Sequence, residues 1–372
     1  MKIAMIGQKQ VPSRKGGIEV AVEALSVRMA ARGHEVTLYN CRRCCKGEKR
    51  EEKKPLRWDY LGVHIHEIPV VNVKGVATML GSLLGTLCAA GRRYDCVHFH
   101  GEGPAFMAFL THALGIRTVV TIHGLDWQRS KWGRFASWYL KWGEKIAATC
   151  ADEIIVLSRA MQEYFRKVYD RNTTLIPNGI EKPVNRAAER IIQLWNLKKD
   201  SYILYLGRIV PEKGLENLIR AFAEIKTEKK LVIAGEPSDA DAFYQRIQTM
   251  AERDSRILFT GFVEGELLDE LYSNSYLYCL PSDVEGMSIS LLEAMSYGNC
   301  CLCSDIPECT EVLGQYGFFF RKGDRKDLRN VLQRLCREPE LIERSRSQVS
   351  DYACENYNWD ETVRKTLMLY SE

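Results

Sequence analysis

YLYCLPSDVEGMSISLLEAM, residues 276–295, joins an apolar run to a helix through a short loop. Residues 276–280 predict a buried strand, and Pro281 ends it. Gly286 gives the backbone freedom to turn, so a helix is expected to begin near Ser288. The first turn of a helix carries unpaired N–H groups and a partial positive charge. The stretch therefore predicts a binding site for an anion, most often a phosphate.

Two carboxylates belong to this stretch. Glu285 precedes the predicted helix and Glu293 lies within it. Because a helix rises about 1.5 Å per residue, the two side chains are too widely placed to share a proton. We expect them to accept hydrogen bonds from hydroxyl groups on either side of a phosphate, as in a ligand made of a sugar, a diphosphate and a ribose. The alternative is a capped amphipathic helix with two solvated acids.

Length and composition limit the class of protein. The 372 residues are enough for two domains, and the net charge of +4 does not indicate a nucleic-acid partner. Residues 1–7 resemble a strand followed by a loop rather than a signal peptide. The longest apolar stretch, residues 76–90, is shorter than the roughly 20 residues that span a bilayer and predicts a buried helix. We expect a soluble, cytoplasmic protein.

The first half of the chain alternates strands and helices, which predicts a parallel sheet with helices on both faces. A helix is expected after Gly16-Gly17, and the charged, aperiodic residues 42–57 predict a solvated loop. The expected strands are residues 2–7, 36–39, 63–68, 96–99, 118–122 and 153–157.

The same pattern restarts after a polar segment, which predicts a second doubly wound sheet. Its expected strands are residues 202–206, 231–234, 257–259, 276–280 and 300–303, and an amphipathic helix is expected at 359–370. The predicted fold class is α/β with two Rossmann-like domains. Their expected bounds are 1–180 and 201–355, with an interdomain linker at 181–200 and a C-terminal helix in 356–372. Open parallel sheets bind ligands beyond the carboxyl ends of their strands.

A glycine-bearing loop follows the first strand of each half. In the second, Gly207-Arg-Ile-Val-Pro-Glu-Lys-Gly214, Arg208 and Lys213 are two cations that could neutralise a diphosphate leaving group. The alternative is a basic surface loop. In the first, Gly16-Gly17 lacks the G-x-G-x-x-G spacing of a dinucleotide site. Its backbone could approach a phosphate or sugar, or it could be a tight turn without a ligand.

Histidines follow two strands of the first half. His123 lies where a loop would enter a ligand site, although a lone His is often a packed structural residue. Of His98 and His100, one is expected to point into the core. His100 and Glu102 could line the acceptor side, and the opposite interpretation is equally open.

An aromatic and basic helix is predicted at residues 130–145. Phe135, Trp138, Tyr139 and Trp142 share one helical face. The favoured interpretation is a stripe that faces the core, with a solvated basic side. The alternatives are a helix that rests on an anionic membrane surface, or a platform for a sugar acceptor.

Thirteen cysteines occur, and two clusters stand out. Cys300, Cys301 and Cys303 fall in a predicted strand, where cysteine behaves as a small apolar residue. Cys41-x-x-Cys44 has the spacing of zinc ligands, but no matching second pair follows. Reduced thiols are therefore expected, with zinc as the less favoured alternative.

Two motifs carry a resemblance to a known family. Glu285 and Glu293, in the context EG-x-x-x-x-LLEAM, and the loop G-R-x-x-x-x-K-G around Arg208 and Lys213 are similar to signatures of the family 4 retaining glycosyltransferases of GT-B fold. The resemblance covers nearly the whole chain. It implies two Rossmann-like domains facing a central cleft, with the last helix crossing back to pack on the N-terminal, acceptor-side domain. The first-half motifs look closest to bacterial capsule and cell-wall polysaccharide enzymes, including rhamnosyltransferases.

The resemblance also implies a role for each site residue. Arg208 and Lys213 would bind the phosphates, Glu293 the ribose, and Glu285 the sugar hydroxyls. His123 would hold the sugar. The expected donor-binding residues are Gly16, Gly17, Arg208, Lys213, Gly286, Met287, Ser288, Ile289 and Glu293, and the expected catalytic residues are Glu285, His123, Arg208 and Lys213.

The expected donor is a UDP-sugar or one of the dTDP-rhamnose type, and the acceptor a saccharide or a lipid-linked saccharide. Gly286-Met287-Ser288 stands where the family commonly has Gly-Phe-Gly, which puts the donor in doubt. No Asp-x-Asp motif is seen near the proposed site, so neither a metal nor another cofactor is expected. The acceptor would bring the enzyme to the inner face of the plasma membrane. The rival functions are a sugar-nucleotide epimerase and a non-catalytic nucleotide-binding protein.

Overall fold

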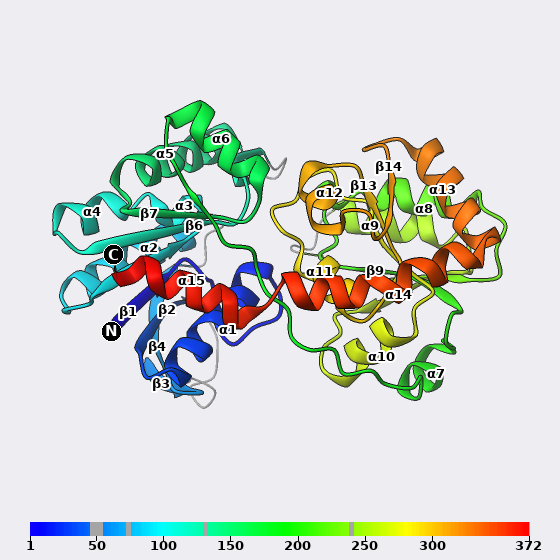
Figure 1. Cartoon of the computed structure of the whole chain (residues 1–372), viewed down its shortest axis with the longest axis horizontal. Helices are drawn as coiled ribbons and strands as arrows, with labels where there is room; N and C mark the ends of the chain where they lie inside the picture. The colour runs from blue at the N-terminus through cyan, green and yellow to red at the C-terminus, as the bar shows by residue number, and fades with distance from the viewer. Residues whose placement is uncertain (45–54, 72–75, 129–132, 238–241, 372) are drawn as a thin grey trace. The chain divides into compact units, whose positions relative to one another are not determined.

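The computed structural model describes residues 1–44, 55–71, 76–128, 133–237 and 242–371. The chain divides into two compact units (Figure 1). Unit 1 comprises Met1–Gly179 together with Trp359–Glu372, and unit 2 comprises Ile180–Asn358. Both units are α/β, and each is built around its own sheet of mainly parallel strands.

Unit 1 has a sheet in which strand β3 runs antiparallel to β4, while the other neighbouring strands that the structure describes run parallel. In spatial order the strands are β3 (Arg57–Tyr60), β4 (Val63–Val71), β2 (Glu35–Cys44), β1 (Lys2–Ile6), β5 (Cys96–His100), β6 (Arg117–Ile122), β7 (Glu153–Val156) and β8 (Thr174–Leu175).

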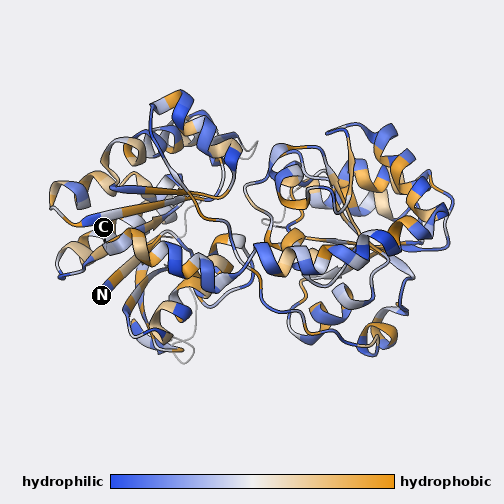
Figure 2. Cartoon of the chain, in the orientation of Figure 1, coloured by the Kyte–Doolittle hydropathy of each residue, from blue (hydrophilic) through white to orange (hydrophobic). Residues whose placement is uncertain are grey.

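Helices cover the sheet of unit 1. They are α1 (Gly17–Ala31), α2 (Val76–Ala90), α3 (Glu102–Ala105), α4 (Ala108–Ala113), the 3-10 turn η2 (Asp126–Gln128), α5 (Arg134–Cys150), α6 (Arg159–Tyr169) and α15 (Trp359–Ser371). The strands of the sheet are mostly apolar, whereas the helices also carry polar residues (Figure 2). Among the described residues, no helix is both long and apolar enough to cross a membrane.

Residues 42–57 differ from the predicted solvated loop. Strand β2 continues to Cys44, because its ladder with β4 runs without a break from Thr37, opposite His64, to Cys44, opposite Val71. Strand β3 then adds Arg57–Tyr60 to the edge of the sheet. The remainder of the predicted loop, residues 45–54, lies outside the described part of the chain.

Helix α5 contradicts the favoured interpretation of its aromatic residues. Phe135, Trp138 and Trp142 are exposed, and Tyr139 is partly buried. The buried side of α5 is lined instead by Leu140, Gly143, Glu144, Ala147 and Ala148. A Cβ on Gly143 would lie 2.0 Å from the carbonyl oxygen of Glu102, so the small residues mark the contact face. The start of the predicted helix, residues 130–132, lies outside the described residues.

Unit 2 contains a parallel sheet packed on both faces. Its strands, in spatial order, are β11 (Ile257–Gly261), β10 (Lys230–Ala234), β9 (Tyr202–Leu206), β12 (Leu277–Leu280), β13 (Cys301–Ser304) and β14 (Phe318–Phe320). Alternate side chains of a strand point to opposite faces. Accordingly, Tyr202 and Leu204 belong to one apolar core, and Ile203 and Tyr205 to the other.

The helices of unit 2 bury their apolar sides on these two cores. They are α7 (Arg190–Trp195), the 3-10 turn η3 (Pro211–Lys213), α8 (Leu215–Ala223), α9 (Ala242–Ala251), α10 (Glu266–Asn274), α11 (Ile289–Ser296), α12 (Pro307–Leu313), α13 (Arg325–Arg337) and α14 (Pro339–Asn356).

Residues 181–200 belong to unit 2, whereas the sequence analysis assigns them to a linker. They include α7, whose Ile191 is fully buried. The carboxylate of Glu270 in α10 accepts hydrogen bonds from the amides of Glu189 and Ile191, at 3.0 and 3.1 Å. This contact holds the segment against the second sheet.

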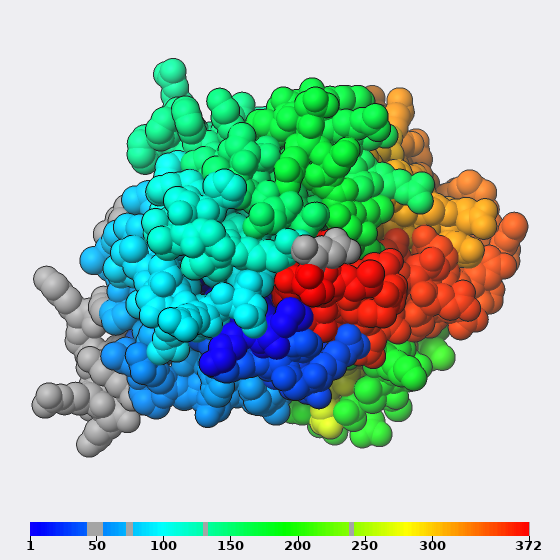
Figure 3. Space-filling model, turned by 60° about the vertical axis from the view of Figure 1, so that its left-hand side comes forward, coloured from blue at the N-terminus to red at the C-terminus, as the bar shows by residue number. Residues whose placement is uncertain are grey.

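Helix α15 packs on unit 1. Arg32 forms an ion pair of 2.9 Å with Asp360, and the guanidinium of Arg117 donates to the carbonyl of Leu369 at 2.7 Å. Figure 3 shows α15 against the N-terminal segment of the same unit. Unit 1 is therefore formed by two separate segments of the sequence, and unit 2 is the segment inserted between them.

Candidate functional site

The loop after β9 and the loop after β12 pack against each other in unit 2. Gly214 has a φ of +67°, and a Cβ at this position would lie 1.9 Å from the carbonyl oxygen of Pro281. The amide of Asp283 donates to the carbonyl of Glu212 at 2.9 Å. Only glycine can bring the two backbones this close. Two motifs far apart in the sequence are thus joined at one edge of the sheet.

Lys213 and Glu285, one from each loop, form an ion pair. The Nζ atom of Lys213 lies 2.5 Å from Oε1 of Glu285, and the side chains are 12% and 8% exposed. An ammonium group has three donors, so Lys213 can keep this contact and still donate to a bound anion. The two residues were predicted to have separate roles, and the structure places them in direct contact.

Arg208 is held at the start of the same loop. Its carbonyl oxygen accepts a hydrogen bond of 2.8 Å from the hydroxyl of Tyr205. Burial raises the pKa of Tyr205 well above its usual value, so this hydroxyl stays a donor. Within the described part of the chain, the guanidinium of Arg208 has no hydrogen-bond or ion-pair partner. Its charge is therefore available to a ligand.

The N-terminus of α11 follows Glu285 directly. Ser288 is the capping residue, and its hydroxyl accepts from the amide of Leu291 at 3.4 Å. Among the residues described, the amides of Gly286, Ser288 and Ile289 have no hydrogen-bond partner. These N–H groups and the helix dipole favour an anion, as the sequence predicts.

Glu293 is oriented by a tyrosine that the sequence analysis did not single out. The hydroxyl of Tyr272 donates to Oε2 of Glu293 at 3.0 Å. Tyr278, also missed, donates to the hydroxyl of Ser290 at 2.8 Å. Both tyrosines are almost fully buried. Buried tyrosines usually find a partner for their hydroxyl, and this rule could have drawn attention to them.

Glu212 is another residue of this edge that sequence reasoning missed. It lies next to Lys213, is 8% exposed, and both its carboxylate oxygens lack a hydrogen-bond partner in the part that the structure describes. The hydroxyl of Ser282, in the facing loop, is also buried without a hydrogen-bond partner among the described residues. Buried polar atoms are normally paired, so unpaired ones at a site mark places where a ligand or water can bind.

Gly16 and Gly17 lie at the start of α1 in unit 1. Gly16 is the capping residue, and a Cβ there would lie 2.1 Å from a carboxylate oxygen of Glu19. Glu19 also accepts from the amide of Lys9 at 3.1 Å. A carboxylate thus already occupies this helix N-terminus, and it would repel a phosphate. The predicted contact of the glycines with the donor stays a prediction, and a neutral sugar suits the position better.

His123 is bonded to a second histidine. Its Nε2 atom lies 3.1 Å from Nδ1 of His100 at the end of β5. Burial lowers the pKa of His123 to about 4 and that of His100 well below its usual value, so both rings are neutral at pH 7. Nε2 of His100 is buried without a partner among the described residues. If the proton of His100 is on Nδ1, this N–H group donates to His123, and the buried Nε2 carries no hydrogen. No N–H group is then left without a partner there.

His98 is the histidine that belongs to the core. Its ring nitrogens lie 2.6 Å from the hydroxyl of Tyr370 in α15 and 2.7 Å from the hydroxyl of Thr121 in β6. Burial lowers its pKa to about 3. His98 therefore ties the C-terminal helix to the sheet, and its ring centre lies 4.1 Å from that of His100.

Glu102 lies in a packed acidic cluster. It is fully buried, and burial, with the nearby carboxylates of Asp126 and Glu144, raises its pKa to about 10. Glu144 accepts hydrogen bonds from Trp127, Tyr164 and Tyr169, at 3.0, 2.8 and 2.6 Å. Glu102 is therefore neutral at pH 7. Its predicted place on the acceptor side is untested by these contacts.

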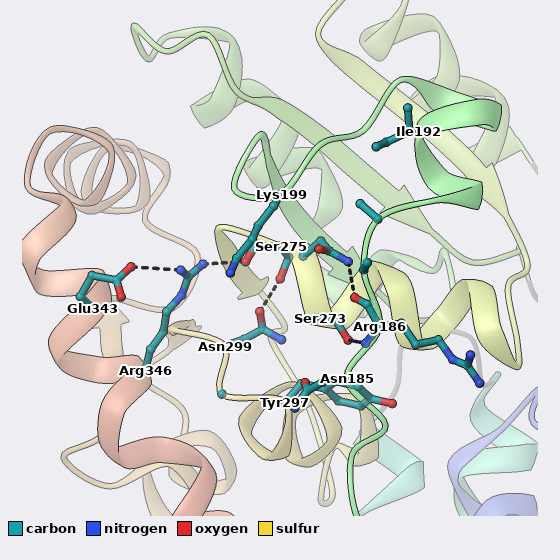
Figure 4. A pocket seen from close by; sticks show the side chains of 14 residues that line it. Asn185, Arg186, Ile192, Lys199, Ser273, Ser275, Tyr297, Asn299, Glu343 and Arg346 are labelled. Atoms are coloured by element: carbon teal, nitrogen blue, oxygen red, sulfur yellow. Dashed lines mark hydrogen bonds and ion pairs between the residues drawn. The ribbon is translucent and has the colours of Figure 1, made fainter.

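A cavity of about 780 Å³ opens at the other edge of the unit 2 sheet (Figure 4). Ser275 and Asn299, which line it, precede β12 and β13, so the cavity lies at the amino ends of these strands. Arg346 crosses it to bond Asp200 at 2.6 Å and the carbonyl of Ser275 at 2.7 Å. None of the predicted site residues lines this cavity.

The cysteine predictions have different outcomes. Cys300, Cys301 and Cys303 are fully buried in and beside β13, which confirms their role as small apolar residues. The sulfur of Cys41 packs on Gly81 of α2, where a Cβ would lie 2.2 Å away. The side chain of Cys44 lies outside the described residues. Among those described, no group of His, Cys, Asp and Glu could hold a metal ion.

Two family models match the chain in succession. The model of Glycosyltransferase Family 4 matches residues 15–182, and that of Glycosyl transferases group 1 matches residues 188–354. The uncharacterized glycosyltransferase YqgM of Bacillus subtilis is 30% identical over 212 residues, which span 56% of this chain and 57% of that protein. An uncharacterized glycosyltransferase of Methanocaldococcus jannaschii is 24% identical across 100% of this chain and 98% of its own.

Solved structures with the same fold align with almost the whole chain. The sucrose-phosphate synthase of Thermosynechococcus elongatus aligns with a TM-score of 0.84 at 21% identity, over 100% of this chain and 98% of its own. The HepE protein of Anabaena, in complex with UDP and glucose, aligns with a TM-score of 0.79 at 17% identity, over 100% and 99%. WaaG, a glycosyltransferase involved in lipopolysaccharide biosynthesis, aligns with a TM-score of 0.75 at 16% identity, over 98% of each chain.

Proposed function

We propose that this chain, which belongs to the family 4 glycosyltransferases of GT-B fold, transfers a sugar with retention of configuration from a nucleotide-diphosphate sugar to a saccharide acceptor. One observation carries the proposal. The backbone contact between Gly214 and Pro281 brings Arg208, Lys213, Glu285 and the start of α11 to one edge of unit 2. Two cations suit a diphosphate, together with the amides of Gly286, Ser288 and Ile289, which lack a partner in the described part of the chain, and the adjoining acid suits sugar hydroxyls.

The proposed reaction is a displacement on one face of the sugar. The bond between the anomeric carbon and the phosphate oxygen breaks, and its electron pair stays on the diphosphate. The acceptor oxygen bonds to the same face, and its proton passes to the leaving phosphate. Lys213 and Arg208 stabilise the charge that develops on the diphosphate. Glu285 orients the sugar, and Glu293, held by Tyr272, accepts the ribose hydroxyls.

The proposed donor is a UDP-sugar or a sugar of the dTDP-rhamnose type. The solved complex of HepE contains UDP and glucose, which supports a uridine nucleotide. Met287 is partly buried against the core beside α11 and would limit the space next to the phosphates. A panel of nucleotide sugars tests the proposal. Release of the nucleoside diphosphate from one of them, only with a saccharide acceptor present, would support it.

The proposed acceptor is a saccharide or a lipid-linked saccharide in polysaccharide synthesis. The naming of WaaG as an enzyme of lipopolysaccharide biosynthesis supports this class. We assign acceptor binding to unit 1, with His123 as a neutral group that holds the sugar. A lipid-linked acceptor would place the reaction at the inner face of the plasma membrane.

We also propose that transfer needs no metal ion. A chelator should then leave the rate of transfer unchanged, and a loss that Mg²⁺ or Mn²⁺ restores would contradict the proposal. The sequence contains one Asp-x-Asp triplet, Asp239-Ala-Asp241, a few residues after β10 and outside the described part of the chain. Asp239→Asn with Asp241→Asn is therefore the matching variant. It should retain full activity.

The two rival functions are separated by the same assay. An epimerase would convert the donor sugar without any acceptor. A non-catalytic binding protein would be stabilised against melting by the donor and leave it intact. Turnover that depends on an acceptor excludes both.

A further inference from the structure

The exposed side of α5 in unit 1 carries a row of large aromatic rings. Phe135, Trp138 and Trp142 are 75%, 52% and 43% exposed. The ring centroids are 5.9 Å apart between Phe135 and Trp138, and 5.8 Å apart between Trp138 and Trp142. Scattered single apolar residues are common on protein surfaces, but a continuous apolar patch marks an interaction site.

Cations accompany this aromatic row. Arg134, Lys141 and Lys145 of α5 are all exposed. The ammonium of Lys145 lies 5.3 Å from the ring centre of Trp142. The only acid of α5, Glu144, is fully buried on the opposite side. The exposed side of the helix is thus apolar and positively charged, without a negative charge of its own.

We propose that this α5 face, made of Arg134, Phe135, Trp138, Trp142 and Lys145, docks on an anionic lipid bilayer; Lys141, whose ammonium lies 4.0 Å from the ring centre of Trp127, is not counted in it. A helix with aromatic residues and cations on one side lies in the interface of a membrane, where rings occupy the headgroup level and cations contact acidic headgroups. An acidic bilayer can contact the aromatic rings and the cations of this face at the same time. The helix would lie on the surface, because only one side of it is apolar.

Other occupants fit the face less well. A second copy of the chain would bring the same cations against each other, which is unfavourable at short range. A sugar stacks on one or two rings but also needs acceptors for its hydroxyls. On the described α5 face, the charged side chains are all donors. The charge of the face therefore selects an acidic lipid surface.

Sedimentation of the full chain with lipid vesicles tests the proposal. The probes are vesicles of phosphatidylcholine, with and without phosphatidylglycerol. We expect binding only to the acidic vesicles, and a decrease as salt is added. Replacing Arg134 and Lys145 by glutamine should weaken binding by about fivefold for each cation. The triple change Phe135→Ser, Trp138→Ser, Trp142→Ser should weaken it by at least about tenfold.

The matched control lies in the same unit. Phe109 of α4 is 45% exposed, and Phe109→Ser should leave vesicle binding unchanged. Circular dichroism would show that each variant remains folded. Three results would overturn the proposal. The chain could bind neutral and acidic vesicles equally, or the triple variant could bind acidic vesicles as well as the wild type does. The triple variant could also lose self-association of the chain while its lipid binding stays unchanged. The assay needs neither donor nor acceptor, so its failure and that of the proposed transfer are separate results.

Discussion

The two units share one architecture, but the carboxyl edges of their sheets carry opposite chemistry. In unit 2 this edge holds a charged pair, Lys213 and Glu285, beside Arg208 and the amides of Gly286, Ser288 and Ile289, which have no hydrogen-bond partner among the described residues. In unit 1 it holds neutral buried groups, the imidazoles of His100 and His123. A doubly wound sheet therefore offers the same place for a ligand in both units, while the loops decide which ligand suits it.

The comparison explains the division of labour that we propose. Fixed positive charge and helix amides favour a diphosphate in unit 2. Neutral imidazoles and the carboxylate of Glu19 at the start of α1 disfavour an anion in unit 1 and suit an uncharged sugar. Four changes test this contrast.

Removing a cation of unit 2 should have the largest effect. Lys213→Ala and Arg208→Ala should each lower kcat by about 100- to 1000-fold, because each removes a charge that stabilises the leaving diphosphate. Steady-state kinetics with the identified donor measures the effect. Lys226→Ala, which removes an exposed cation of the same unit, is the control and should change kcat by less than about twofold. Wild-type kinetics in both site variants would refute the phosphate role.

Adding a methyl group at Gly214, between the two loops of unit 2, should lower the free energy of unfolding. Gly214→Ala combines a left-handed backbone with overlap on Pro281, and we expect a loss of about 3–4 kcal/mol in urea unfolding. Gly261→Ala is the matched control, since its φ is +72° and no atom lies within 4 Å of the added methyl. It should cost only about 1 kcal/mol. Equal losses would mean that the contact with Pro281 does not hold the loops together.

The neutral ring of His123 should make unit 1 less stable in mild acid. The pKa of His123 is lowered to about 4 in the folded protein, from its usual 6.5. The unfolded chain therefore binds a proton first. The stability from the neutral ring is complete above about pH 6.5 and is lost as the pH falls toward 4, by up to about 3 kcal/mol. Urea midpoints measured across this range test it.

The variant His123→Gln isolates this contribution. It should reduce the loss of stability between pH 6.5 and 4 relative to the wild type. Glu102 acts in the opposite direction, because its raised pKa makes the folded protein less stable as the pH rises above about 4.5. An unchanged pH profile in the variant would show that His123 is not held neutral by burial.

Loss of a single acceptor for the ribose should have the smallest effect. Glu293→Ala should raise the Kd of the nucleoside diphosphate by about tenfold in calorimetry, as expected for one hydrogen bond to a charged group. Glu285→Ala should mainly reduce kcat. Tyr272→Phe, which removes the hydroxyl that donates to Glu293 and to the carbonyl oxygen of Ser290, is the milder comparison. If both acids can be removed without effect, neither of them binds the donor.

Hydrophobic periodicity predicted most of the fold. Strand β9 has the predicted bounds, residues 202–206, because a fully buried strand reads as a continuous apolar run. Strand β3 was missed, since its four residues Arg57–Tyr60 alternate charged and aromatic side chains beside a charged segment. Its place depends on pairing with β4, which no local pattern reveals.

The site was predicted in its parts but not in its contacts. The motifs identified Lys213 and Glu285 separately, and their ion pair depends on how Gly214 seats one loop on the other. Periodicity likewise grouped Phe135, Trp138 and Trp142 on one side of α5 without indicating which side is buried. Gly143 and the small residues that follow it carried that information, because they permit close backbone contact.

The return of the chain to unit 1 has a consequence for synthesis. Tyr370, whose hydroxyl bonds to His98, lies in α15, which follows unit 2 along the chain. During translation, the strands of unit 1 emerge before unit 2 but must wait for α15 before their layer is complete. The inserted unit emerges as one uninterrupted segment, so it can finish folding earlier, reversing the usual N-to-C order on the ribosome.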